Sequence, residues 1–349
     1  GRATEDEFKP LRLQNGLYIQ RHAPMLRIAI AYGMLNSSQL RKLGSVSEKY
    51  DRGYGHLTTR QNMQLNWIEF DDVPKALDEL AEVGLHGIQS SGNCLRNITS
   101  DAYAGISVDE ILDPRPYAEL LRQWSTFHPE LSFLPRKFKV AFTGTKEDRA
   151  LIQVHDLAFE AISREPQATF RVRAGGGLGR IPVLGPIIRE SLDWKDIRSY
   201  THALMRVYNE LGRRDNLTKA RIKILIRTVG VDVFKSMVES EFENLKNTAD
   251  KLTSGDLDKI KNRFSDSQFL RSSYIPTDSQ PKSKKILGSE FTKWLTNNVH
   301  EHRINHFKAV LIPVKGPERA PGDITTEEMY KLADIADTFS FGMLRVTHT

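Results

Sequence analysis

Hydrophobic positions in the first part of the chain follow two different spacings, which predicts strands and helices in turn. Apolar residues recur at every second position in two stretches and at every third or fourth position in two others. The predicted order is strand, helix, strand and helix, at residues 26–31, 38–49, 57–70 and 73–83. Ser37 and Asp72 precede the two helices, where side-chain oxygens can accept hydrogen bonds from free backbone N–H groups. This stretch is therefore expected to form one compact α/β unit.

The last part of the chain repeats this plan. A strand is predicted over 308–314, a helix opens with a capping box of Thr325 and Glu328, and a second strand covers 343–346. Two pairs of segments align, RIAI at 27–30 with KAVL at 308–311, and HLTTR at 56–60 with RVTHT at 345–349. The second copy is thus expected to end inside its own last strand. Coincidence between two generic α/β units stays open as the alternative.

Between the two copies lies a segment with its own pattern of elements. Helices are predicted at 117–124, 149–162, 196–211 and 219–247, and strands at 137–142 and 169–173. After it the chain becomes polar, rich in Ser, Asp and Lys, which is typical of a linker. We therefore expect the two ends of the chain to pack together as one α+β domain, with a separate α/β domain inserted between them.

Composition narrows the possible functions. A chain of 349 residues with 39% hydrophobic and 27% charged residues is a globular protein rather than a disordered or fibrous one. Its apolar runs are far shorter than the ~20 residues that span a bilayer, so no membrane segment is predicted. The single cysteine, Cys94, permits no internal disulfide and no iron–sulfur cluster held by several thiolates, and it favours the reducing cytoplasm.

The net charge of +6 makes an anionic partner plausible. Lys137 and Lys139 alternate with apolar residues, so both ammonium groups point to one face of the predicted strand. A half-exposed strand with a solvated basic face would explain them equally simply. Because the basic residues lie singly on strands, without a stripe of stacking aromatics, a nucleic-acid binder is a weak alternative and no nucleic-acid partner is expected.

Further candidate residues lie on the strands and turns of both units. Arg27 shares its strand face with two alanines, which leaves room for a flat ligand. Arg60 and Gln64 share a hydrogen-bonding face with two asparagines, although an ordinary amphipathic strand would look the same. Arg96 lies in a turn-rich stretch, and the glycines 175–177 directly follow a strand, so their backbone N–H groups could approach an anion. Nothing in the sequence has the spacing of a hydrolase or a P-loop.

Taken together, these segments resemble the siroheme-containing sulfite and nitrite reductases over nearly the whole chain, from about residue 8 to 349. The motifs are TTRQNMQ at 58–64, SGNCLRNI at 91–98, LPRKFK at 134–139, GGGLG at 175–179 and RRDNLTKARIK at 213–223. Each motif alone is modest, but their order and spacing are specific. The resemblance implies an α+β fold in which a ferredoxin-like pseudo-two-fold domain is built from both ends of the chain around an inserted α/β siroheme-reductase domain. The implied parts are a half-domain at 8–87, the siroheme domain at 88–246, a linker at 247–289 and a truncated second half-domain at 290–349.

The resemblance also implies a reaction, the six-electron reduction of sulfite to sulfide or of nitrite to ammonia at siroheme coupled to a [4Fe-4S] cluster. A ferredoxin or a flavoprotein would donate the electrons. Four residues match the cations that bind the substrate anion and supply protons: Arg27, Arg96, Lys137 and Lys139. Six match siroheme contacts: Arg60, Gln64, Gly175, Gly176, Gly177 and Arg221.

Two departures from the family pattern limit what the chain is expected to do alone. His56 stands where sulfite reductases often have a second siroheme-binding arginine. The cluster cysteines belong to a half of the family's sequence that is absent here, and Cys94 cannot replace them. The chain by itself is therefore expected to hold no cluster or other metal, little or no siroheme, and to be inactive without that missing C-terminal half. A non-catalytic anion-binding or assembly subunit that kept only this half is the alternative.

Overall fold

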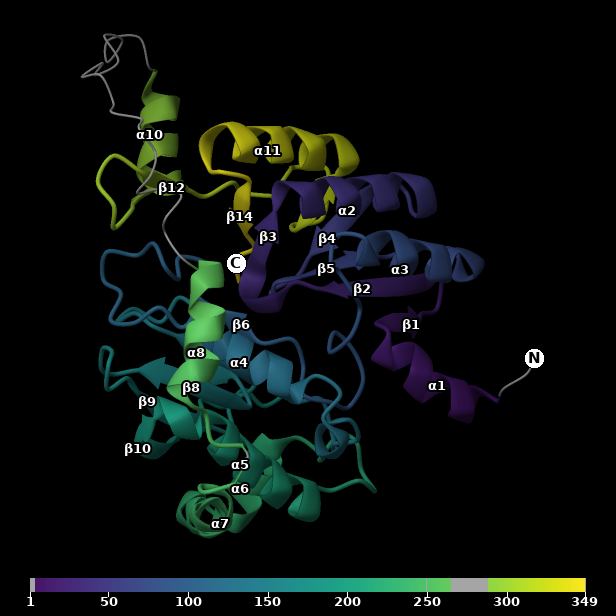
Figure 1. Cartoon of the computed structure of the whole chain (residues 1–349). Helices are drawn as coiled ribbons and strands as arrows, with labels where there is room; N and C mark the ends of the chain where they lie inside the picture. Colours follow the sequence, from purple (N-terminus) through teal and green to yellow (C-terminus); the bar gives the residue numbers. More distant parts are fainter. Residues whose placement is uncertain (1–3, 249, 265–287, 349) are drawn as a thin grey trace.

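The computed structural model describes residues 4–248, 250–264 and 288–348, in which two five-stranded sheets belong to two separate large hydrophobic cores (Figure 1). The first core is built from 17–85 together with 324–346, so it joins both ends of the chain. The second core is built from 95–264. This arrangement is the expected α+β fold, a pseudo-two-fold ferredoxin-like domain with an inserted α/β domain.

The first sheet has five strands in the order β1-β2-β5-β4-β13. Their bounds are Leu17–Ile19, Pro24–Ala29, Asn62–Leu65, Tyr54–Leu57 and Asp323–Thr325. Helices α2 (Ser37–Tyr50), α3 (Val73–Ala81) and α11 (Thr326–Phe339) lie above it in Figure 1, and α2 packs along α11. Strand β13, from the far end of the chain, therefore completes a sheet that the first half-domain begins.

A two-fold relation links the two half-domains with a constant offset of 289 residues. Strand β3 (Met34–Asn36) pairs with β14 (Met343–Arg345), just as β4 pairs with β13. The Ser37 N–H donates to the Gly342 carbonyl at 2.8 Å, and the Thr326 N–H donates to the Gly53 carbonyl at 2.9 Å, with 326 − 37 = 342 − 53 = 289. Helices α2 and α11 are each 14 residues long and open with a capping box. The alignment of 56–60 with 345–349 has this same offset.

Two strand predictions hold only over short stretches, Asn62–Leu65 within 57–70 and Lys308–Val310 within 308–314. Residues 57–70 form a hairpin turn and β5 instead of one strand, because Gln61 has a φ of +54° and the Gln61 N–H donates to the Thr58 carbonyl at 2.9 Å. Strand β12 (Lys308–Val310) pairs only with β11 (Val299–Glu301), in a small exposed hairpin outside the main sheet. The alignment of 27–30 with 308–311 therefore does not reflect equivalent positions.

The second sheet has the order β10-β9-β8-β7-β6. Its strands are Ile187–Asp193, Thr169–Ala174, Leu157–Ala161, Val140–Thr143 and Thr99–Ser100, and β6, β7 and β8 run parallel. The predicted helix 149–162 was wrong, since the segment holds only a short 3-10 turn (Ile152–Val154) followed by the central strand β8. Leu157, Ala158, Phe159 and Ala161 are all buried, and a short apolar run buried on both faces cannot be told from a helix by its periodicity.

Several helices flank this sheet, and others lie nearer the two ends of the chain. Helices α4 (Arg115–Ser125) and α5 (Ile197–Leu211) agree with prediction, but the single helix predicted at 219–247 is split at Gly230, whose φ is +91°. Its two parts are α6 (Ile222–Val229) and α7 (Val231–Leu245). Elsewhere in the described ranges lie the helices α1 (Glu5–Gln14), α8 (Ser254–Lys261) and α10 (Ser289–Asn298).

The segment predicted as a linker is helical in part. Leu257 and Ile260 of α8 and Phe264 just after it are buried in the second core, so residues 254–264 belong to the packed domain. Residues 249 and 265–287 of the predicted linker 247–289 lie outside the described residues, and the domain limits remain a prediction. Within the described ranges, no helix combines the length and the apolar character that crossing a membrane requires.

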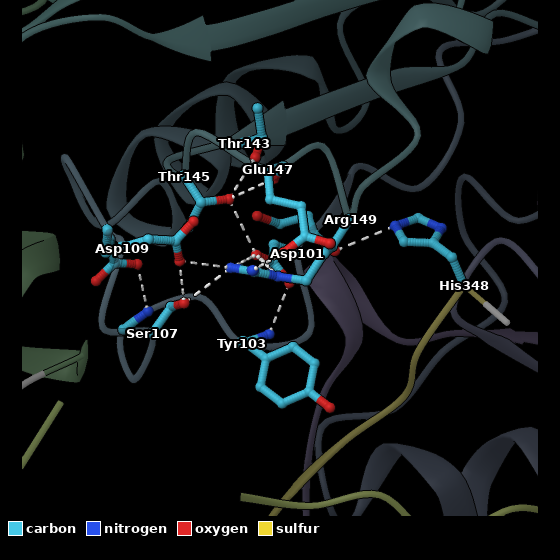
Figure 2. A network of polar contacts seen from close by, with 12 residues as sticks. Asp101, Tyr103, Ser107, Asp109, Thr143, Thr145, Glu147, Arg149 and His348 are labelled. Carbon is cyan, nitrogen blue, oxygen red and sulfur yellow. Dashed lines mark hydrogen bonds and ion pairs between the residues drawn. The ribbon is translucent and has the colours of Figure 1, made fainter. Parts of the chain in front are cut away.

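A buried ionic network holds the loops at the end of the second sheet (Figure 2). Asp101, only 1% exposed, accepts hydrogen bonds from the Arg149 Nε at 3.0 Å and from the Thr145 hydroxyl at 3.3 Å. The Arg149 Nη2 also donates to Ser107 Oγ at 2.8 Å and to Asp109 Oδ1 at 3.1 Å. One guanidinium thus ties three separate chain segments together.

Candidate functional site

Arg27 and Arg96, which are 69 positions apart (96 − 27), donate to the same carbonyl oxygen. The Nη1 atoms of Arg27 and Arg96 lie 3.3 Å and 2.9 Å from the Ser90 oxygen. Arg27 projects from β2 and also donates to Gln64 Oε1 at 3.0 and 2.6 Å, and to the Tyr18 hydroxyl at 3.1 Å. Both guanidinium groups are therefore fixed in position by neutral acceptors, so their charges remain uncompensated.

Lys137 and Lys139 lie just before β7, where Phe138 forms a bridge with Leu95 beside Arg96. Among the described residues, neither ammonium group has a hydrogen-bond or ion-pair partner. Burial, together with the charges of Arg96 and Arg221, lowers the pKa of Lys137. Burial, with Arg60 and Arg221, lowers the pKa of Lys139 to about 7. Two desolvated cations beside arginines without a partner are costly unless an anion joins them.

Asp156 provides a buried carboxylate that contacts both Arg221 and the backbone of Lys139. Its Oδ1 accepts hydrogen bonds from the Arg221 Nε at 3.0 Å and Nη2 at 2.6 Å, and its Oδ2 accepts the Lys139 backbone N–H at 2.9 Å. The aspartate is fully buried at the start of β8. It fixes the Arg221 guanidinium and the backbone of Lys139, and leaves the Lys139 ammonium free to face a ligand.

Arg60 lies in the turn between β4 and β5, so its predicted place on a strand was wrong. It donates to Thr99 Oγ1 at 2.8 Å and to the Asn97 carbonyl, and it contacts His155 Nε2. His155 is buried, and both burial and Arg60 hold its pKa well below the usual value. The neutral ring therefore accepts from Arg60 through Nε2 while its Nδ1–H donates to the Leu151 carbonyl at 2.8 Å.

The burial of Arg60 has an electrostatic consequence. Burial lowers its pKa to about 9; the Asp156 charge opposes this, and the charges of Arg96 and Arg221 add to it. Arg60 is thus part of the same electrostatic group as the lysines.

Glycines 175–177 pass directly beside this group. Gly175 has a φ of +82° and its N–H donates to the Asp156 carbonyl at 2.9 Å. A Cβ on Gly176 would lie 2.3 Å from the Gln153 carbonyl oxygen, and one on Gly177 would lie 3.1 Å from Arg221 Nη2. The loop therefore needs glycine both for its own turn and to keep the space next to Arg221 open.

The structure thus brings the predicted cations into one group, which we call the cation cluster: Arg27, Arg60, Arg96, Lys137, Lys139 and Arg221. Gln64 and the glycine loop border it. Sequence reasoning missed Tyr18, His155, Asp156 and Lys223, whose ammonium donates to the Ile181 carbonyl at 2.6 Å behind the glycine loop. Lys223 ends the motif at 213–223 without being singled out in it, and no quoted motif contains Tyr18, His155 or Asp156, because their roles arise only from tertiary contacts.

We expect anion binding to the cation cluster to weaken as the pH rises through about 7. The Lys139 ammonium is protonated below its pKa of about 7 and neutral above it, so the cluster loses a charge in this range. Sulfate keeps a constant charge over the same range and is a suitable probe. Its dissociation constant, measured by calorimetric titration, should rise by roughly tenfold between pH 6 and 8.5. In Lys139→Met this pH dependence should disappear; an unchanged profile in that variant contradicts the assignment.

In comparisons with known proteins, the first half-domain and the inserted domain both match domains of nitrite and sulfite reductases. The family model "Nitrite/Sulfite reductase ferredoxin-like half domain" matches residues 18–83, and "Nitrite and sulphite reductase 4Fe-4S domain" matches 91–246. The chain is 30% identical to the chloroplastic ferredoxin–nitrite reductase of Arabidopsis thaliana, over 93% of this chain and 50% of that protein. It is 31% identical to sulfite reductase [ferredoxin] 1 of Mycolicibacterium paratuberculosis, over 63% of this chain and 40% of that protein.

A solved structure is also similar. The NirA protein of Mycobacterium tuberculosis superposes with a TM-score of 0.62 at 29% identity, covering 66% of this chain and 46% of that one. The chain therefore spans about half the length of the curated relatives it matches.

Proposed function

Because the chain belongs to the siroheme-containing sulfite and nitrite reductase family, we propose that it forms the anion-binding half of such a reductase. The enzyme would reduce sulfite to sulfide or nitrite to ammonia. One observation carries the proposal: Lys137 and Lys139 have no partner among the described residues, although four arginines act on them. Sulfite or nitrite would provide the negative charge that these two lysines lack within the protein itself.

The cations would act in two ways. Arg27 and Arg96, fixed by the Ser90 carbonyl, would orient the oxygens of the anion and stabilise the negative charge that develops as its bonds to oxygen break. Lys139, with a pKa of about 7, would donate a proton to a departing oxygen and regain it from solvent near neutral pH. Lys137 would hold the anion next to it as a second ammonium donor.

The residues present fit the carboxylates of siroheme. Arg60 and Arg221 would pair with them, and the space that a Cβ on Gly177 would fill next to Arg221 stays open for the ring system. When bound, siroheme supplies the iron at which the anion is reduced. The relatives named as ferredoxin-dependent favour a ferredoxin as the electron donor, with a flavoprotein as the other choice.

The residues present do not fit a [4Fe-4S] cluster. Cys94 is the only cysteine in the sequence, and within the described part of the chain no group of three or more His, Cys, Asp or Glu side chains could hold a metal ion. We therefore assign no step to a cluster on this chain and propose that a further cysteine-bearing half supplies it in the complete enzyme. The cytoplasm, or a similarly reducing compartment, is where such a protein would act.

The purified chain should contain no cluster in stoichiometric amounts. Chemical analysis for iron and acid-labile sulfide is expected to give far less than four of each per chain, because one thiolate cannot ligate a cluster. Little or no siroheme absorbance is expected as well. Iron and sulfide at cluster stoichiometry after anaerobic purification would refute this.

The activity itself is tested on the complete reductase with a chemically reduced ferredoxin. Sulfide and ammonia are measured separately, with sulfite and nitrite as alternative substrates. We expect one of the two products to form with the complete protein and neither with this chain alone. Absence of both products from a protein that carries siroheme and cluster would favour the alternative, a non-catalytic anion-binding or assembly subunit.

A further inference from the structure

A second polar site lies away from the cation cluster. A cavity of about 400 Å³ is lined by Tyr32 after β2, Glu119 and Arg122 of α4, and Arg345 of β14. Both half-domains and the inserted domain meet at its wall, but no residue of the cation cluster lines it. Its volume is within the range of small-molecule sites and far exceeds that of a few waters.

Arg345 brings to this cavity a positive charge that forms no direct ion pair among the described residues, although the charge of Asp113 acts on it from a distance. Its Nη1 donates to the carbonyl of its neighbour Leu344 at 3.0 Å, and no carboxylate of the described residues forms an ion pair with it. Burial, reinforced by the charge of Arg115, lowers the pKa of Arg345 to about 9, so it is still charged at neutral pH. A guanidinium held in this way gains most from a carboxylate or phosphate group, two oxygens of which accept two of its parallel N–H groups.

The acidic residue of the cavity cannot supply this partner. Both oxygens of Glu119, which is 2% exposed, already accept hydrogen bonds. Arg122 donates to them at 2.6 and 2.8 Å, Gln123 at 2.7 Å and the Tyr32 hydroxyl at 3.2 Å. Glu119 therefore neutralises Arg122 and has no capacity left for Arg345.

A second unsatisfied group lines the same cavity. The Nδ1 atom of His86 is buried and has no hydrogen-bond partner in the structure. Burial, together with the charge of Arg122, lowers the pKa of His86, so the ring is neutral near pH 7 and offers one donor and one acceptor. The remaining wall is mixed: Ile30, Leu85 and Ile88 contribute apolar surface, and amides such as Gln39 and Asn97 contribute polar surface. A cavity that combines an unpaired guanidinium, an unsatisfied ring nitrogen and a partly apolar wall suits a ligand that has an acidic head and an apolar portion.

We propose that this cavity binds a small organic oxyanion, a carboxylate or phosphate ester with an apolar body, whose acidic group pairs with Arg345 and contacts His86. The site is separate from the proposed substrate site. It joins the pseudo-two-fold domain to the inserted domain, so its ligand holds the two domains together.

The proposal is tested by calorimetric titration of the purified chain with phenyl phosphate, phenylacetate and inorganic phosphate, at constant ionic strength. Phenyl phosphate and phenylacetate distinguish an ester phosphate from a carboxylate as the preferred head. We expect at least one of them to bind at one site and more tightly than inorganic phosphate does, because only they carry an apolar body. In Arg345→Gln the dissociation constant should rise at least tenfold. Arg41→Gln is the matched control, since Arg41 is paired with Asp334 and Asp337 at the surface.

Two further variants keep the result interpretable. Ala31→Met narrows the cavity from its wall without changing charge, and it should also weaken binding. It takes over as the test if the melting temperature shows that Arg345→Gln does not fold. Arg27→Met disrupts the cation cluster and should leave this binding unchanged. Binding that survives both Arg345→Gln and Ala31→Met, or no binding of either aromatic probe, overturns the proposal. Binding that is lost only in Arg27→Met also overturns it, while supporting the anion-binding role of the cation cluster.

Discussion

Lys137→Met in the complete reductase should lower kcat/KM for its anionic substrate by at least about a hundredfold. The ammonium has no partner among the described residues, so its charge is available to the substrate in the transition state. Folding stability should change little, or increase, because the methionine removes a desolvated charge from a group of cations. Steady-state kinetics and urea unfolding of the same preparation separate the two effects.

The control for this prediction is Lys146→Met, which removes an exposed lysine from the same domain. It should change neither kcat/KM nor stability measurably. A Lys137→Met enzyme with the activity of the control would show that the cation cluster is not the substrate site, whereas an inactive but unfolded variant would point to a structural role.

Arg149→Met is expected to destabilise the inserted domain by about 3–5 kcal/mol. The change removes the only cation that forms an ion pair with Asp101 among the described residues, and it leaves a carboxylate that is 1% exposed without a counter-charge (Figure 2). The free energy of unfolding in urea measures the loss. The far-ultraviolet circular dichroism of the folded variant should remain that of the parent.

Arg171→Met is the matched control, because Arg171 pairs with Glu190 at an exposed position on β9. Surface ion pairs contribute only about 0–1 kcal/mol, so this variant should be close to the parent. Equal losses in the two variants would mean that burial of Asp101 does not determine the effect. Asp101→Asn combined with Arg149→Met should recover part of the lost stability, because the buried charge is then removed.

Local signals in the sequence predicted the helices of the half-domains well. The capping box at Thr325 and the apolar faces of both helices depend only on neighbouring residues; α11 begins directly after Thr325, whereas α2 is capped by Asn36 rather than by the predicted Ser37. The hairpin at Arg60 was missed because its left-handed residue is Gln61 rather than glycine, so the turn has no composition signal. Strand β8 was missed because it is buried on both faces.

The cation cluster illustrates the same limit for the site. The sequence indicates which cations alternate with apolar residues, and the family resemblance relates them to one another. It does not indicate that Asp156 neutralises Arg221, or that His155 must be neutral to accept from Arg60. Asp156 lies 65 positions from Arg221, and His155 lies 95 positions from Arg60. Local periodicity carries no information over such separations in the sequence.

The pairing of β13 with β4 and of β14 with β3 has a consequence for synthesis on the ribosome. Until residues 323–345 emerge, β3 and β4 expose unpaired backbone edges, and the first core lacks Ile324, Met329 and Ala333. At ~5–20 residues per second, the interval between residues 57 and 323 lasts on the order of tens of seconds. Throughout that time two strand edges of the nascent half-domain have unpaired backbone groups that can pair with other chains. Newly made chains should therefore depend on a chaperone that binds unfolded chains, and they should aggregate when translation stalls before residue 323.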